Sequence, residues 1–147
     1  MLLQKESNPG LNTITAYGAG YVEINGQSYT HPVRMGPDGP VEHWLVEDVA
    51  QLTYAALREL AGVEDSSSDP MAFLDNVGPK NTSGTEVLLI GTGDRQYLLP
   101  QAVIGPLLRI GIGVESMSTQ AAARTYNILM SEGRRVVVAL IPPQEQE

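Results

Sequence analysis

The stretch that decides the fold is residues 85–143, TEVLLIGTGDRQYLLPQAVIGPLLRIGIGVESMSTQAAARTYNILMSEGRRVVVALIPP. Three short apolar runs lie within it, at residues 85–91, 110–116 and 134–143. Runs of this length and composition are typical of strands that are buried on both faces. The two segments between these runs, residues 99–111 and 118–133, have the composition of helices. This alternation of strand and helix predicts right-handed crossovers and largely parallel central strands.

The ends of the two helical segments carry recognisable signals. Ser118 is the expected N-cap of the second helix, and Gly133 is expected just beyond its C-terminal end. Pro100 suits the start of the first helix, because a proline there sacrifices no intrahelical hydrogen bond. The pair Gly105-Pro106 can interrupt that helix, since proline lacks the amide that the helix interior needs.

The N-terminal third has the composition of antiparallel sheet, from about residue 12 to residue 45. Asn25-Gly26 predicts a two-residue hairpin turn, because both positions of such a turn need positive φ. Gly18 and Gly20 predict a bulge or bend, and the chemistry of residues 35–40 predicts a turn. We expect a short strand at about residues 41–45.

A helix is expected from about residue 47 to residue 61, ended by Gly62. Residues 64–70 and 78–84 have loop composition, and residues 71–77 between them suit a short helical turn. The prediction is therefore one α/β domain spanning residues 1–147. It has an antiparallel N-terminal part, about 12–45, and an α/β core, about 46–143.

Composition narrows the classes of function. The chain has 147 residues, 42% of them hydrophobic, and a formal net charge of -8, so we expect a globular protein that does not bind nucleic acid. It has no cysteine, which excludes disulfides, thiolate metal sites and cysteine nucleophiles. No apolar run approaches the roughly 20 residues that span a bilayer, and the first ten residues lack the apolar core of a signal peptide. A cytoplasmic location is the resulting expectation.

A helical wheel assigns the side chains of residues 118–133. Tyr126 falls on the inward side with the residues that share or widen that face, namely Ala121, Ala122, Thr125, Ile128, Leu129 and Met130. Arg124 and Asn127 fall on a narrow polar strip opposite, with Gln120 and Ser131. Two interpretations of this strip remain open. It is either the solvent edge of the helix or a rim where another molecule docks.

A second candidate site is Gly91-Thr92-Gly93, which ends the first apolar run. Ligands in open α/β sheets bind at the carboxyl ends of strands. The stretch matches neither G-x-G-x-x-G nor a P-loop, so a plain tight turn is the competing interpretation. Glu115 lies near the end of the next run, where it could bind a ligand, form a carboxylate pair with Glu132, or form an ion pair with Arg134 or Arg109. The two histidines, His31 and His43, lack the spacing of metal ligands, and no catalytic set, metal or cofactor is predicted.

Taken together, these segments resemble a small α/β family of unknown function that includes a mitochondrial respiratory complex I assembly factor and an adipogenesis-associated protein. The resemblance covers residues 86–143 well and the N-terminal sheet more loosely. It rests on the strand with GTG, the GIGVE strand, the RTYN helix and EGRRVVVAL. The resemblance implies a three-layer fold with a mixed central sheet and an extra antiparallel piece. It marks these positions: Gly91, Thr92, Gly93, Glu115, Thr119, Arg124, Thr125, Tyr126, Asn127, Glu132, Gly133 and Arg134.

This chain departs from the family at two positions and in one loop. Ser118 stands where relatives have Asp, and serine can still cap the helix. Ala123 stands where Cys is common, so thiol chemistry is excluded here. The loop from Glu64 to Gly84 is long for the family.

Two functions follow from residues and resemblance together. The first is a non-catalytic protein-interaction domain or assembly helper, for which we expect a protein partner. The second is a binder of small anionic ligands, or an enzyme, with its site at the strand end formed by Gly91–Gly93. The predicted binding residues are Gly91, Thr92, Gly93, Glu115, Arg124, Asn127 and Arg134.

Overall fold

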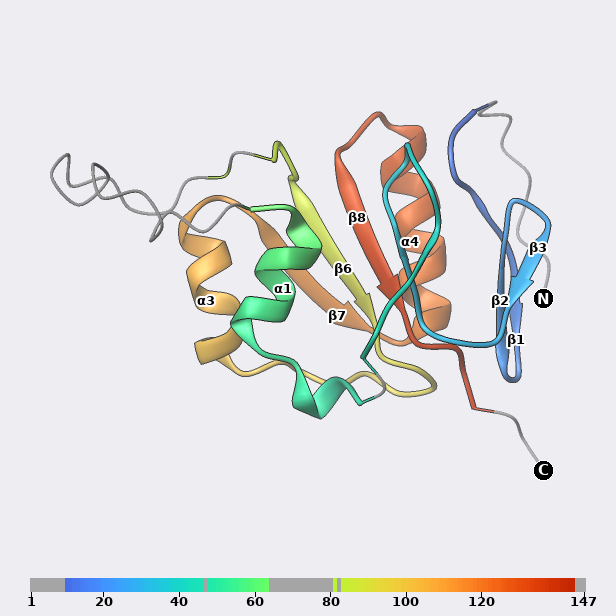
Figure 1. Cartoon of the computed structure of the whole chain (residues 1–147), viewed down its shortest axis with the longest axis horizontal. Coiled ribbons are helices and arrows are strands. Elements are labelled where there is room, and N and C mark those ends of the chain that lie inside the picture. Colours follow the sequence, from blue (N-terminus) through green and yellow to red (C-terminus); the bar gives the residue numbers. More distant parts are fainter. Residues whose placement is uncertain (1–9, 47, 64–80, 82, 145–147) are drawn as a thin grey trace, which may run out of the picture.

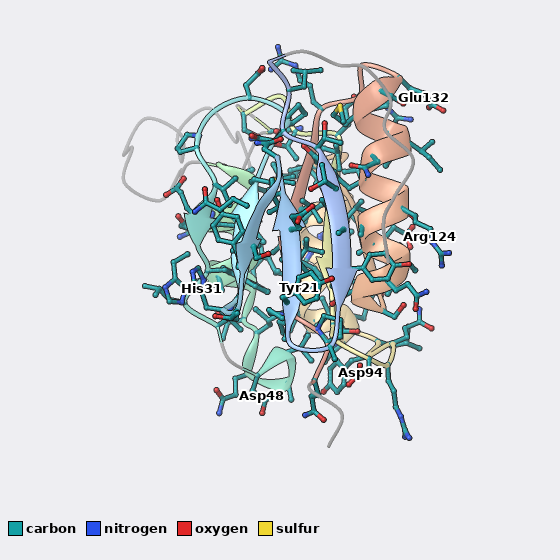
Figure 2. The ribbon with its side chains drawn as sticks, turned by 90° about the vertical axis from the view of Figure 1, so that its right-hand side faces the viewer. Tyr21, His31, Asp48, Asp94, Arg124 and Glu132 are labelled. Carbon is teal, nitrogen blue, oxygen red and sulfur yellow. The ribbon has the colours of Figure 1, made fainter. Side chains whose placement is uncertain are left out.

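A computed structural model of the chain describes residues 10–46, 48–63, 81 and 83–144. Its central feature is a mixed sheet in the order β5-β4-β8-β6-β7. Helices α1 (Tyr54–Ala61) and α3 (Gln101–Arg109) cover one face of this sheet (Figure 1). The other face carries α4 (Thr119–Ser131) and a second, three-stranded sheet, which lie beside each other in Figure 2. The predicted three-layer arrangement is confirmed.

The strands and helices of the C-terminal half follow the predicted order. Strands β6 (Val87–Gly91), β7 (Gly113–Met117) and β8 (Val136–Leu140) are parallel, with β6 paired to both of the others. Because β7 and β8 flank β6 on opposite sides, right-handed crossovers place α3 and α4 on opposite faces of the sheet. Ser118 caps α4 by accepting a hydrogen bond from the amide of Ala121, as predicted.

The N-terminal part forms the second sheet from β1 (Ile14–Gly18), β2 (Tyr21–Ile24) and β3 (Gln27–Tyr29). Asn25 and Gly26 have φ of 54° and 82°, so the predicted hairpin is confirmed. Gly18 ends β1, paired with Tyr21, and Gly20, with φ of 82°, lies in the turn that follows, so the predicted bend is present; the irregular pairing lies between Ile14 and Ala16. Strands β4 (Val33–Met35) and β5 (Glu42–His43) join the central sheet, where β4 is antiparallel to β8.

The helix predicted over residues 47–61 is wrong in its first half. Residues Val49–Gln51 form a short 3₁₀ turn, η1, in which the Asp48 side chain accepts a hydrogen bond from the Ala50 amide. Leu52 is extended, and Thr53 caps a new helix, α1, by accepting from the Ala56 amide. Two local caps therefore replace one long helix. Residues 47 and 64–80, which include the predicted loop and helical turn, lie outside the described residues.

The pair Gly105-Pro106 does not interrupt α3, which continues through it to Arg109. Proline removes one hydrogen bond, to the carbonyl four residues earlier. That carbonyl belongs to Ala102, which is exposed, so water can reach it. The helix consequently tolerates the proline without a break.

Two hydrophobic clusters occupy the two faces of the central sheet. One lies under α1 and α3 and contains Trp44, Leu88 and Ile90. The other lies under α4 and the second sheet and contains Leu89, Tyr126 and Met130. Alternate residues of β6 thus enter opposite clusters, as the period of a strand requires.

Candidate functional site

Helix α4 carries the first group of predicted residues. Tyr126 is fully buried, as the wheel predicts, and its hydroxyl donates a hydrogen bond of 2.8 Å to the carbonyl of Asn12. Burial, with a smaller contribution from the charge of Asp38, raises the pKa of Tyr126 well above its usual range. The tyrosine therefore stays neutral and acts as a core residue that joins α4 to the start of β1.

The helical-wheel prediction for Asn127 is wrong. Its predicted place is the water-facing strip, but it is half-buried against β1. Its side chain accepts from the amide of Ile14 at 3.0 Å and donates to the carbonyl of the same residue at 2.8 Å. The buried arc of α4 is thus rotated toward Ala123 and Asn127, because the three-stranded sheet packs on that side. Ile128, predicted to face inward, is 57% exposed for the same reason.

Arg124 is exposed, as predicted. Figure 2 shows it on the outer flank of α4, pointing out from the helix and apart from the turn that carries Asp94. It therefore does not supply positive charge to the Gly91–Gly93 turn. Its role in binding stays a prediction.

The Gly91–Gly93 turn is held by Thr119, the first residue of α4. The Thr119 hydroxyl accepts from the amide of Gly93 at 2.8 Å, and it donates to the carbonyl of Ile141. A Cβ at Gly91 would lie 2.7 Å from Leu140 Cδ2 and 3.0 Å from Thr119 Oγ1, so only glycine leaves room for this contact. Gly93 has φ of 94°, which also favours glycine.

These contacts occupy the donors that an anion would need. The amide of Thr92 donates to the carbonyl of Met117, and the amide of Gly93 is used by Thr119. The adjacent cavity, of about 280 Å³, is lined by Gly93, Asp94 and Gln120 together with Tyr17, Gly18 and Pro143. The Asp94 carboxylate at this cavity repels phosphate and carboxylate groups. The geometry therefore favours a structural turn over an anion site.

Glu115 and Arg134 do not join the turn. Glu115 is exposed on β7, whereas Arg134 lies before the start of β8, at the opposite end of the sheet from Gly91. Arg134 Nε lies 3.3 Å from Glu86 Oε2, so Glu86 rather than Glu115 is its partner. A hydrogen bond from the Arg135 amide, reinforced by the charges of Arg134 and Arg135, holds the pKa of Glu86 below its usual value. The predicted binding residues thus lie at separate places.

Two features were missed by sequence reasoning. Asn12 is buried and binds three partners: its amide nitrogen donates to the carbonyls of Gly36 and Gly39, at 2.9 and 3.0 Å, and its oxygen accepts from Asn25. A single asparagine before a strand has no sequence signature for this role. The second feature is the role of the Thr119 hydroxyl. The family resemblance marks position 119, but nothing in the sequence indicates which groups this hydroxyl binds.

Large apolar side chains are exposed in two loops at one end of the molecule. Leu45 is 85% exposed and Leu98 is 74% exposed, and Tyr97 beside Leu98 is 39% exposed. Strand β4 is antiparallel to both β5 and β8, and β8 is parallel to β6, so β5 and β6 run in the same direction and the loops that follow them begin at the same end of the molecule. The loops also lie together at the lower end of Figure 1. Leu45, Tyr97 and Leu98 are named the loop-end patch below.

The described part of the chain holds no group of three or more histidine, aspartate or glutamate side chains placed to bind a metal. In the same residues, no helix combines the length and the apolarity required to cross a bilayer.

Comparison with known proteins places these features in a family. The chain is 28% identical over 141 residues to the "13 kDa major membrane protein" of Francisella tularensis, covering 96% of this chain and 99% of that protein. It is 30% identical over 142 residues to human NADH dehydrogenase (ubiquinone) 1 alpha subcomplex assembly factor 3, covering 97% of this chain and 66% of the human protein.

Solved structures agree with the fold. A crystal structure from Bordetella parapertussis has a TM-score of 0.75 and 47% identity, covering 92% of this chain and 99% of that one. A solution structure from Bordetella pertussis, described as an Mth938-like domain, has a TM-score of 0.74 and 48% identity, covering 99% and 95%. A family model, "Protein of unknown function (DUF498/DUF598)", matches residues 14–141. Since that match spans most of the chain and relatives include a complex I assembly factor, the protein belongs to this small α/β family of unknown function, DUF498/DUF598.

Proposed function

We propose that this protein is a non-catalytic protein-interaction domain that helps other proteins to assemble. The observation that carries the proposal is the loop-end patch, in which Leu45 and Leu98 are 85% and 74% exposed. Exposed apolar side chains that gather at one end of a molecule lower its solubility, unless a partner covers them. Relatives named as assembly factors support a protein as that partner.

The charges around the patch indicate the chemistry of the partner. Asp48 and Asp94 are exposed at the same end of the molecule, as Figure 2 shows. The whole chain carries a formal net charge of -8. We therefore expect a partner surface with apolar anchors surrounded by lysine or arginine, since complementary charge favours encounter and apolar contact favours residence. The net charge of -8 also supports a protein partner over nucleic acid.

The alternative proposal, a small anionic ligand at Gly91–Gly93, finds less support. The amides of Thr92 and Gly93 already donate to Met117 and Thr119. Asp94 adds negative charge beside the turn. A ligand there would have to displace hydrogen bonds that hold β6 to α4, and Arg124 is not directed toward it.

Site-directed photocrosslinking in the cells that make the protein tests the proposal. A benzophenone amino acid replaces Leu98 in one variant and Leu45 in another. Ile128, which is 57% exposed on α4, is the matched control because it is apolar and lies outside the patch. We expect one and the same protein to be crosslinked from positions 45 and 98 and not from position 128.

Adducts from position 128 alone, or no adduct from either patch position, would contradict the proposed surface. A Leu98→Ser variant should also lose most of its partner in gentle co-purification, whereas Ile128→Ser should keep it.

We further propose a cytoplasmic location. Because one relative is named a membrane protein, fractionation of the same cells into cytosol and membrane checks this directly.

A further inference from the structure

A cavity of about 420 Å³ opens at the end of the sheet opposite the loop-end patch. This volume falls within the range of small-molecule sites, about 300–1,000 Å³. The apolar residues of its lining, named the floor below, are Leu11, Pro37, Met130, Val136 and Val137. The charged residues of the lining are Asp38, Arg134 and Arg135, and none of them belongs to the proposed partner surface.

The order of the strands places opposite charges on opposite walls. Strand β8 lies between β4 and β6, and the cavity sits over the start of β8. Asp38 follows β4 and forms one wall. Arg135, just before β8, lines the cavity together with Ser83 and Thr85, which precede β6 on the far side. Neighbouring strands are about 4.8 Å apart, so β4 and β6 stand about 10 Å apart across the cavity.

Arg135 is seated against a glycine and remains available for a ligand. A Cβ at Gly84 would lie 2.9 Å from Arg135 Nη1, so the absence of a side chain there makes room for the guanidinium. Arg134 is engaged by Glu86, whereas no described carboxylate forms an ion pair with Arg135. Arg135 is exposed at the cavity, and its guanidinium can bind a carboxylate through two parallel hydrogen bonds.

Both walls are held in place before any ligand arrives. Asn12 binds the carbonyls of Gly36, Pro37 and Gly39, which fixes the turn that carries Asp38. On the other wall the Thr85 hydroxyl donates to the carbonyl of Ala61 at 2.9 Å. Preorganised walls lower the entropy cost of binding.

We propose that this cavity binds a small zwitterion, with its carboxylate on Arg135, its amine toward Asp38 and its apolar body on the floor. Asp38 disfavours a plain anion such as phosphate, and Arg135 disfavours a plain amine. The apolar floor selects a compact aliphatic body over a polar one. A free aliphatic α-amino acid has all three features.

Three matched probes test the proposal by NMR titration of the full chain. Leucine carries both charges, 4-methylpentanoate lacks the amine, and 3-methylbutylamine lacks the carboxylate. We expect leucine to shift the amide signals of residues 36–38, 83–85 and 134–136, with a Kd at least tenfold lower than either single-charge probe. Inorganic phosphate should neither bind there nor compete.

Two substitutions assign the charges. Arg135→Gln keeps the backbone amide that binds Glu86, and Asp38→Asn keeps the shape of the turn, so both should fold. Each should raise the Kd for leucine at least tenfold, whereas Arg95→Gln, at the other end of the molecule, should leave it unchanged. Three results would each overturn the proposal. They are no leucine binding at 10 mM, a concentration about one thousand times a Kd of about 10 μM, equal binding of 4-methylpentanoate, and tighter binding of phosphate.

Discussion

Asn127 gives the backbone of Ile14 the partners that a neighbouring strand would give. Its side-chain amide accepts from the Ile14 amide and donates to the Ile14 carbonyl, at 3.0 and 2.8 Å. Strand β1 is an edge of the three-stranded sheet, so the backbone groups of Ile14 on that side have no strand beside them. One side chain on α4 therefore both closes this edge and joins the second sheet to the helix.

Replacing Asn127 by alanine should destabilise the protein by about 1–3 kcal/mol, because a half-buried donor and acceptor of Ile14 lose their partner together. The measurement is urea unfolding combined with hydrogen exchange at the Ile14 amide, which should lose protection. Gln120→Ala is the control, since that side chain is exposed on the same helix and its loss should cost no more than about 0.5 kcal/mol. Equal stability of the two variants would show that the pair of hydrogen bonds contributes nothing.

Among the elements, α4 is joined to two strands of the central sheet by a single hydroxyl. Thr119 is fully buried at the start of α4, accepts from Gly93 after β6 and donates to Ile141 after β8. Its own amide also donates to the carbonyl of Gly93 at 2.8 Å. The helix start, the turn and the last strand are consequently fixed together at one point.

Thr119→Val removes this hydroxyl while keeping the shape of the side chain. The amide of Gly93 and the carbonyl of Ile141 would lose a buried partner, so we expect a loss of about 2–4 kcal/mol of unfolding free energy. Thr119→Ser keeps the hydroxyl and loses one methyl group, for about 1 kcal/mol. Thermal and urea unfolding of the two variants measures the difference. A valine variant as stable as the serine variant would mean that the hydroxyl only fills space.

Helices and strands can be predicted from the sequence where residues close in the sequence determine them. The βαβαβ order follows from apolar runs and the Ser118 cap, and the Asn25-Gly26 hairpin follows from its turn chemistry. Local sequence signals do not predict the orientation of a side chain when a segment distant in the sequence determines it. The side of α4 that carries Asn127 is set by the second sheet, which a helical wheel cannot contain.

The candidate site was less predictable for the same reason. Gly91–Gly93 and Arg134 each carry a local signal, but their separation at opposite ends of the sheet depends on strand direction and length. Asn12 and Arg135 carry no local signal, because their partners are backbone groups and a glycine that only the fold brings near. The loop-end patch could not be predicted, because the amino-acid sequence of the two loops does not show which of their apolar side chains are exposed.

At the scale of the whole molecule, the central sheet couples two hydrophobic clusters. Within β6, Leu88 packs toward α1 and α3, whereas Leu89 packs toward α4 and the second sheet. Neither cluster can form without the same three parallel strands. We therefore propose that the chain folds as one cooperative domain, with no independent N-terminal unit.

Trp44, the single tryptophan, reports on one cluster, and the methyl group of Met130 reports on the other. We expect urea unfolding followed by Trp44 fluorescence and by the Met130 methyl signal to give the same midpoint. Leu89→Ala should cost about 2–5 kcal/mol, because it opens a cavity in the cluster that contains Met130. If the sheet couples both faces, this substitution must lower the Trp44 midpoint as much as the Met130 midpoint, although Leu89 belongs to the cluster opposite Trp44. A Trp44 midpoint that stays in place while the Met130 midpoint falls would divide the chain into two units.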